Sequence, residues 1–317
     1  MRVFIGIDIG GTNVNIGLVS EEKQVMDEIV ISTNPEKGPE DALNRIAFSL
    51  QHMISNGQGN AVYKGIGIGL PGLLDIENGS IIEASNLPGW QHYPIARELN
   101  KRVNIPVSIE NDANLAALGE YWLGAGQEAE NLFMVTLGSG IGGALLGNGK
   151  ILRLHPSAGE FGHMIIEKSG ATCTCGRKGC LETYVSKHGF QRLVREKIHE
   201  DPQSSLRNYK AGMISPQVIA MNATQGDTLA IRIFREAGEA LGIALSNVIN
   251  LTGVHCIIIG GGIANAWELL CEPVMQSLEK NVFNAIFTVV KVHKAALGEK
   301  AGFIGAARLA ADSLRGT

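Results

Sequence analysis

Three cysteines and a histidine form the most distinctive chemical group in the sequence. Cys173, Cys175 and Cys180 lie close together, and His163 precedes them. One imidazole and three thiolates are the ligand set of a closed tetrahedral zinc site, which is structural because no coordination position stays open. The alternative is a set of three buried thiols without a metal. Since the intervening loop is polar and rich in glycine, the sequence favours a structural Zn²⁺ site.

Three glycine turns are a second group that could do chemistry. The first, with Thr12 and Asn13, follows the apolar run 2–9, the second spans 138–143, and the third follows the apolar run 254–259. Backbone N–H groups without a neighbouring Cβ can form a nest for phosphate. The alternative is that these are ordinary hairpin turns, but their recurrence favours phosphate binding. The glycines and their polar neighbours are Gly10, Gly11, Thr12, Asn13, Gly138, Ser139, Gly140, Gly260, Gly261 and Gly262.

The second turn also matches the Gly-x-Gly-x-x-Gly fingerprint of dinucleotide sites. That fingerprint requires a strand followed by a helix, whereas the residues after Gly143 predict a strand and a turn, so the match is weak. The sequence contains no Walker-type phosphate loop. Asp8, at the end of the first apolar run, could order Mg²⁺ through water.

Asp112 is the strongest candidate for a catalytic base. It stands where an expected strand, 107–110, meets an expected helix, 113–122. An aspartate there could simply cap the helix. However, phosphoryl transfer needs chiefly positioning and one carboxylate that accepts the proton of the attacking hydroxyl, and a helix N-terminus would keep Asp112 ionised.

The elements that must position these groups alternate between strands and helices. A strand, a glycine turn and a second strand occur twice, at 4–19 and at 133–146. This repetition predicts two similar halves and an α/β molecule with a cleft between two lobes, where small-molecule sites are favoured. Strands are expected over 2–9, 14–19, 24–32, 65–70, 107–110, 133–137, 144–146, 254–259 and 288–294, and helices over 40–56, 95–103, 113–122, 227–251, 264–279 and 302–311.

Composition narrows the class of protein. The chain has 317 residues, of which 45% are hydrophobic and 18% charged, so it can bury a sizeable core. The net charge of −4 gives no electrostatic surface for nucleic acid or an anionic membrane. No apolar stretch approaches the ~20 residues that span a bilayer, and the first residues show no export signal, so we expect a cytoplasmic protein.

The motifs resemble those of a known family. Asp8-Ile-Gly-Gly-Thr12 and the two later glycine turns are similar to the nucleotide-contacting segments of the sugar kinase, heat-shock protein and actin superfamily. Glu110-Asn-Asp-Ala-Asn114 and the segment from Glu160 to Glu182 resemble the ROK family, and within it the bacterial glucokinases. The likeness covers nearly the whole chain. It implies a two-lobed actin/hexokinase-like (ribonuclease H-like) fold, with one lobe over 1–115 plus 302–317 and the other over 116–301.

The resemblance also implies roles for single residues. Asp112 is the expected base for the sugar 6-hydroxyl, and the glycine turns are expected to bind the phosphates and adenosine of ATP with Mg²⁺. One nitrogen of His163 is expected to bind zinc while the other faces the sugar. Trp90 could stack on the sugar, although a loop anchor is the better interpretation. The residues expected to contact the sugar are Gly72, Asn111, Asp112, Glu160, His163 and Glu182.

The function that this predicts is ATP-dependent phosphorylation of a hexose at its 6-hydroxyl, with glucose favoured. Mannose, allose, fructose, N-acetylglucosamine and N-acetylmannosamine stay open as substrates, because single side chains decide between such sugars. A sugar-sensing repressor of the same family is less favoured, since only seven residues precede Asp8 where repressors have a helix-turn-helix. An actin-like ATPase would leave the cysteine cluster unexplained. Family habit indicates a homodimer.

Overall fold

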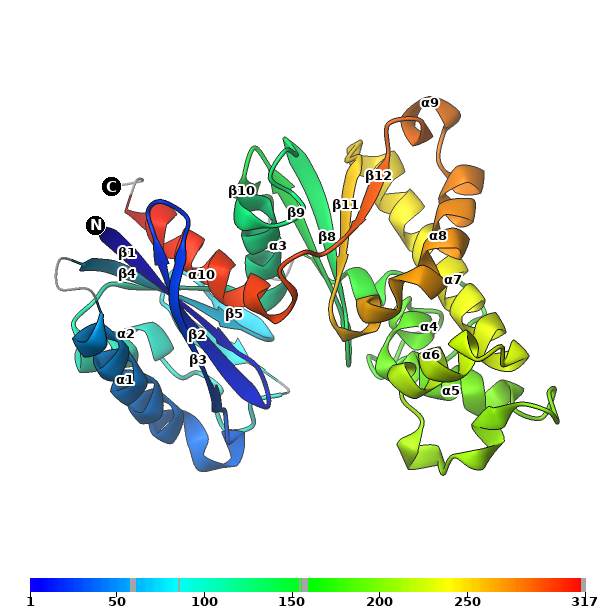
Figure 1. Ribbon diagram of the computed structural model, residues 1–317, viewed down its shortest axis with the longest axis horizontal. Coiled ribbons are helices and arrows are strands. Elements are labelled where there is room, and N and C mark those ends of the chain that lie inside the picture. The colour runs from blue at the N-terminus through cyan, green and yellow to red at the C-terminus, as the bar shows by residue number, and fades with distance from the viewer. Residues whose placement is uncertain (58–60, 85, 154, 156–158, 315–317) are drawn as a thin grey trace. The chain divides into compact units, whose positions relative to one another are not determined.

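The computed structural model describes residues 1–57, 61–84, 86–153, 155 and 159–314 (Figure 1). The last three residues of the predicted segment 302–317, and residues 154 and 156–158 of the predicted lobe 116–301, therefore lie outside the described residues. The chain divides into two compact units. Unit 1 contains Met1–Glu130, Ala144–Ala158 and Ala296–Thr317, and unit 2 contains Asn131–Gly143 and Gly159–Ala295.

The sheet of unit 1 has five strands in the order β3-β2-β1-β4-β7. The first three strands of the chain form an antiparallel meander, and β4 and β7 continue the sheet parallel to β1. The carboxyl ends of β1, β4 and β7 therefore lie at one edge of the sheet. The strands are β1 (Arg2–Ile9), β2 (Asn13–Ser20), β3 (Val25–Ser32), β4 (Val62–Leu70) and β7 (Val107–Asn111).

Helices cover both faces of this sheet (Figure 1). Alternate residues of β1, such as Ile5 and Ile7, pack into one core with α1 (Gly38–Asn56) and α2 (Ile95–Val103). Phe4 points to the opposite face, where it packs with α3 and α10. This is the alternation that a strand buried on both faces requires. These two helices are α3 (Asp112–Leu123) and α10 (Ala301–Ser313).

Glycines let α10 approach its neighbours unusually closely. A Cβ on Gly305 would lie 1.7 Å from the carbonyl oxygen of Leu115 in α3, and one on Gly6 would lie 1.7 Å from that of Phe303. No side chain fits at these distances. The same unit contains the hairpin β5 (Leu73–Asp75) and β6 (Ser80–Glu83) and the 3-10 turns η1 (Pro35–Lys37) and η6 (Gly298–Lys300).

The second sheet has the order β10-β9-β8-β11-β12, and the boundary between the units passes through β9. β11 pairs in parallel with both β8 and β12, whereas β9 and β10 pair antiparallel with each other. Every residue of β11 is buried. The strands are β8 (Asn131–Leu137), β9 (Ile141–Gly147), β10 (Lys150–Ile151), β11 (Cys256–Gly260) and β12 (Lys291–Lys294).

Unit 2 is otherwise helical, with α7 (Thr228–Thr252) and α8 (Trp267–Asn281) packed side by side (Figure 1). α7 begins at the cap Asp227, whose carboxylate accepts a hydrogen bond from Ala230 N, and ends at Gly253 with φ 72°. The other helices are α4 (Glu182–Val185), α5 (Lys187–Lys197), α6 (Pro216–Thr224) and α9 (Asn284–Phe287), with the 3-10 turns η2 (Phe161–His163), η3 (Ser205–Asn208), η4 (Ala211–Met213) and η5 (Gly262–Ala266).

Two predicted elements begin three residues later than the sequence indicated. The strand expected over 288–294 covers only 291–294, because its ladder with β11 starts at Cys256–Lys291 and α9 occupies 284–287. The helix expected from residue 264 begins at Trp267, after η5. Within the described residues, no helix combines the length and the apolarity needed to cross a bilayer.

Candidate functional site

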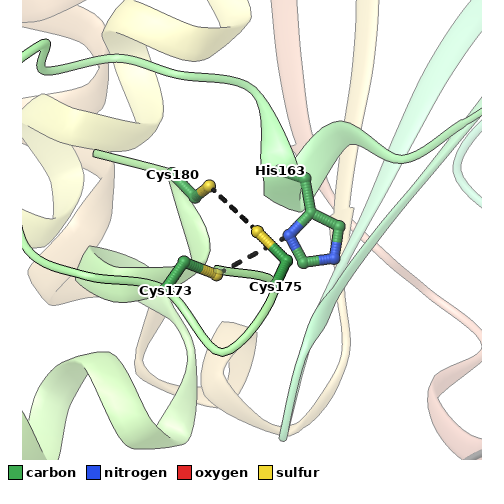
Figure 2. Close-up of side chains that lie close together, drawn as sticks. All are labelled: His163, Cys173, Cys175 and Cys180. Carbon is green, nitrogen blue, oxygen red and sulfur yellow. Dashed lines mark hydrogen bonds between the residues drawn. The ribbon is translucent and has the colours of Figure 1, made fainter. Parts of the chain in front are cut away.

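The four predicted zinc ligands lie together in unit 2 (Figure 2). The ligand atoms of His163, Cys173, Cys175 and Cys180 are all within 4.8 Å of one another. Cys173 Sγ lies 3.7 Å from His163 Nδ1, and the sulfurs of Cys175 and Cys180 are 3.6 Å apart. A tetrahedral zinc ion with bonds of about 2.3 Å to sulfur and 2.0 Å to nitrogen separates its ligands by about 3.5–3.8 Å. The cluster therefore fits a Cys₃His zinc site.

Backbone geometry around the cysteines explains why the loop closes. Gly176 and Gly179 adopt φ of 85° and 77°, and a Cβ on Gly179 would lie 1.7 Å from Glu167 O.

A hydrogen bond from the Arg177 amide lowers the pKa of Cys175 to about 6, so this thiol ionises near neutral pH. Burial raises the pKa of Cys180. Zinc would have to displace the Cys180 proton, which thiolate coordination does readily.

Glu182 lies directly after this cluster, as the first residue of α4, and contacts the second glycine turn. Its Oε2 accepts a hydrogen bond from Ile141 N at 3.2 Å. On the other side of the turn, Lys187 N donates to Gly138 O at 2.9 Å. A Cβ on Gly140 would lie 2.8 Å from Glu182 Oε2, so a side chain at that position would displace the Glu182 carboxylate. The segment after the cysteines thus holds the turn at both of its ends.

Glu160 precedes the cluster in the sequence and lies near His163, one of its four members. His163 Nε2 is 3.9 Å from Glu160 Oε2, and its other nitrogen, Nδ1, faces Cys173. The Glu160 side chain is 70% exposed and is accessible to a ligand. Glu160, His163 and Glu182, the three predicted sugar contacts of unit 2, are therefore attached to one metal-binding segment.

The β7–α3 junction presents Asn111 and Asp112. The Asn111 side chain caps α3 by accepting a hydrogen bond from Ala113 N at 3.0 Å, and Asp112 Oδ1 accepts from the same N–H at 2.8 Å. Asn111 is thus the N-cap residue, and Asp112 opens the first turn. Burial raises the pKa of Asp112 to about 6. A carboxylate with such a pKa is suited to general-base catalysis near neutral pH.

Asp8 lies at the same edge of the sheet. It is the penultimate residue of β1 and lies opposite Gly69 of β4, which in turn pairs with Glu110 of β7. The absence of a side chain at Gly69 and Gly302 leaves room for the Asp8 carboxylate, since a Cβ there would lie 3.2 Å and 2.4 Å from its oxygens. Burial and, to a smaller extent, the negative charge of Asp112 together raise the pKa of Asp8 to about 7.

The remaining predicted positions are turns. Gly10 N donates to Asn13 O at 2.9 Å, which closes the first glycine turn, and Thr12 and Asn13 are exposed there. Gly72 adopts φ 90° with no room for a Cβ, which would lie 2.2 Å from Glu83 O.

Gly261 has φ 85°, and a Cβ on it would lie 2.4 Å from Leu137 O. Beside Gly262, a cavity of about 300 Å³ opens between α6 and α8, with Gln217 and Met221 among its lining residues.

The structure also contains features that the sequence alone did not reveal. Glu110 is 2% exposed and pairs with Arg153, a contact between residues far apart in the sequence. Trp90 is fully buried in the core of unit 1, which confirms the interpretation as a loop anchor.

The predicted site residues are divided between the two units. Unit 1 holds Asp8, Gly10, Gly11, Thr12, Asn13, Gly72, Asn111 and Asp112, and unit 2 holds Gly138, Ser139, Gly140, Glu160, His163, Cys173, Cys175, Cys180, Glu182, Gly260, Gly261 and Gly262.

Comparison with known proteins places the chain in a family. The model of the ROK family matches residues 4–313. The chain belongs to the ROK family. A glucokinase of Thermotoga maritima is a ROK relative with 36% identity to it, over 98% of each chain.

Solved structures agree with this assignment. The ROK hexokinase of Thermus thermophilus superimposes with a TM-score of 0.83 at 29% identity, over 99% of this chain and all of the hexokinase. A ROK glucokinase of Streptomyces griseus in complex with glucose and AMPPNP gives 0.79 at 31% identity, over 98% of this chain and 99% of that one. The predicted α/β fold class of the actin and hexokinase type is thereby confirmed.

Proposed function

We propose that this ROK-family protein is an ATP-dependent hexokinase that converts glucose to glucose 6-phosphate. Glucokinase relatives over nearly the whole chain and a related structure with glucose and AMPPNP support this activity. The structural observation that carries it is the Asp112 carboxylate, whose pKa is raised to about 6 at the carboxyl edge of the sheet. That carboxylate can accept a hydroxyl proton near neutral pH.

In unit 1 we assign the reacting groups. Asp112 accepts the proton of the glucose 6-hydroxyl as that oxygen forms a bond to the γ-phosphorus and the bond to the ADP oxygen breaks. Asn111 and the loop at Gly72 bind sugar hydroxyls. The turn from Gly10 to Asn13 binds phosphate oxygens through its backbone N–H groups. When bound, Mg²⁺ supplies positive charge on the phosphates, and Asp8 would hold it through water.

In unit 2 we assign recognition. Glu160, His163 and Glu182 accept or donate hydrogen bonds at glucose hydroxyls, and the structural zinc ion fixes the segment that contains all three. Gly138, Ser139 and Gly140 bind phosphate. The Gly260–Gly262 turn and the cavity beside it bind adenosine.

We also propose a cellular setting and an assembly for this protein. A glucokinase in the cytoplasm would begin glycolysis, and a homodimer is the assembly that we propose. The net charge of −4 supports a protein that binds neither nucleic acid nor an anionic membrane.

The test is a panel of hexoses with ATP, scored by ADP release in a coupled assay. We expect glucose to give the highest kcat/KM among glucose, mannose, allose, fructose and the two N-acetylated hexosamines. A preference for an N-acetylated sugar would change the substrate while keeping the kinase. No ADP release with any hexose would contradict the proposal.

A further inference from the structure

The buried carboxylate of Glu110 directly precedes the proposed sugar-binding residue Asn111 and the proposed base Asp112 in the chain. Glu110, in β7, is 2% exposed. Its Oε1 accepts hydrogen bonds from Asn111 N at 2.9 Å and from Asn114 Nδ2 at 3.0 Å. Because Asn111 and Asn114 stand on either side of Asp112, this one oxygen fixes the backbone on which Asp112 is mounted.

The other oxygen of Glu110 forms an ion pair with Arg153. Oε2 accepts a hydrogen bond from the Arg153 guanidinium, which is 26% exposed. Among the described residues, Arg153 is the one cation that forms an ion pair with Glu110. Arg153 follows β10 in the sequence. The charge of Glu110 in β7 is therefore neutralised by a residue that lies far from β7 along the chain.

We propose that Arg153 is a positioning residue for phosphoryl transfer, acting through Glu110 on Asn111 and Asp112. This inference rests on the hexokinase function proposed above. Removal of one partner of a buried ion pair leaves the other charge uncompensated, and two amide donors do not replace the missing guanidinium. Without Arg153, the uncompensated charge of Glu110 would draw in water or shift the side chain, and either change disturbs its bonds to Asn111 and Asn114. The loss of these bonds would displace both Asn111, which is proposed to bind sugar, and the proposed base Asp112.

This mechanism differs from simple packing because it depends on charge. If Arg153 acts by neutralising Glu110, then removal of the Glu110 charge should partly restore an enzyme that has lost Arg153. A residue that acts only by filling space gives no such recovery. The two substitutions should therefore be strongly non-additive.

The experiment measures steady-state kinetics with glucose and MgATP for Arg153→Met, Glu110→Gln, the double variant and Arg153→Lys. We expect Arg153→Met to lower kcat/KM for glucose about 100-fold, while KM for MgATP changes less than about twofold. The double variant should recover about 10-fold of that loss, and Arg153→Lys should retain most of the activity. Arg102→Met is the matched control, since Arg102 pairs with Glu40 and is 19% exposed, and its kcat/KM should stay within about twofold of the wild type.

Each result decides between explanations. A double variant no better than Arg153→Met, or a loss in Arg153→Met that falls on MgATP as much as on glucose, would overturn the positioning role. Should Arg153→Met fail to fold, Glu110→Gln carries the test because it leaves the Arg153 guanidinium without its carboxylate partner, and a wild-type kcat/KM for glucose in that variant would overturn the role. A wild-type protein inactive on every hexose would overturn the proposed function together with this inference, whereas an active wild type with unaffected variants would overturn this inference alone.

Discussion

Glu182 accepts a hydrogen bond from the backbone N–H of Ile141 at 3.2 Å, and its carboxylate therefore lies against the second glycine turn. Glu182 is also one of the residues proposed to bind sugar hydroxyls. Before any ligand binds, a negatively charged group thus contacts a turn that is proposed to bind phosphate. Like charges compete for the same N–H donors.

Substitution of Glu182 by glutamine should strengthen nucleotide binding in the absence of sugar. Removal of the negative charge at the turn should lower the Kd of MgAMPPNP about 3- to 10-fold, while glucose binding weakens. Isothermal titration calorimetry without sugar measures this. Glu160→Gln is the control, because Glu160 is proposed to bind sugar and, within the part of the chain that the structure describes, forms no hydrogen bond with the turn; its MgAMPPNP Kd should not change. An unchanged or weaker MgAMPPNP affinity in Glu182→Gln would show that the carboxylate does not oppose phosphate.

Asp112→Asn should remove turnover but retain sugar binding. An amide cannot accept the hydroxyl proton, so we expect kcat to fall about 10²- to 10⁴-fold, with the glucose Kd changed less than tenfold. Because the base acts when ionised and its pKa is raised to about 6, wild-type kcat/KM should fall as pH drops below that value. The residual activity of Asp112→Asn should lack this acid limb. Turnover near the wild-type level would remove Asp112 from the role of base.

In the absence of ligands, Asp8 should contribute strongly to the pH dependence of stability, in the same direction as Asp112, whose pKa is also raised. The folded pKa of Asp8, about 7, lies above the ordinary value of 3.8, so the folded state binds the proton more tightly than the unfolded state does. Stability therefore declines as pH rises from about 4 to about 7 and stays reduced above that range. Asp8→Asn should raise the free energy of unfolding at pH 8 by about 2–4 kcal/mol, and by much less at pH 4.

Urea unfolding at the two pH values measures the effect of Asp8→Asn. Asp27→Asn serves as the control because Asp27 is exposed, and it should raise the free energy of unfolding at neither pH by a comparable amount. A stabilisation by Asp8→Asn that is equal at pH 4 and pH 8 would rule out linkage to this carboxyl.

Loss of the metal cluster should weaken sugar binding and stability together. Cys175→Ser should lower the zinc content from about one ion per chain to near zero and raise the glucose KM about 10-fold, because the same segment holds Glu160 and Glu182. Metal analysis, thermal melting and kinetics measure the three effects. Cys271→Ser removes a thiol outside the cluster and should leave zinc content unchanged. Wild-type protein that contains no zinc after expression in zinc-supplemented medium would contradict the assignment.

Local pattern was sufficient to predict most of the fold. β1 and α2 have the bounds that the sequence predicts, because an apolar run ended by glycines and an amphipathic stretch each have one compatible structure. α9 was missed, since a four-residue helix with an apolar composition has no periodicity to detect. The cysteine and histidine cluster could be predicted because residue type alone restricts what four such ligands bind. The pairing of Glu110 with Arg153 could not, because it depends on a tertiary contact that neither residue's neighbours encode.

Gly302 provides a last test, of how Asp8 is held. A Cβ at this position in the first turn of α10 would lie 2.4 Å from Asp8 Oδ2 and 2.5 Å from its Cγ. Glycine to alanine in a helix ordinarily stabilises by up to about 1 kcal/mol, so a fall in the melting temperature of Gly302→Ala would be the sign of a clash. We expect that fall, and a rise of about 10-fold in the KM for MgATP because Asp8 must move. Gly212→Ala has open space around the added methyl group and should change neither quantity by a comparable amount. If Gly302→Ala instead melts at a higher temperature with an unchanged KM, Asp8 does not depend on the space that this glycine leaves.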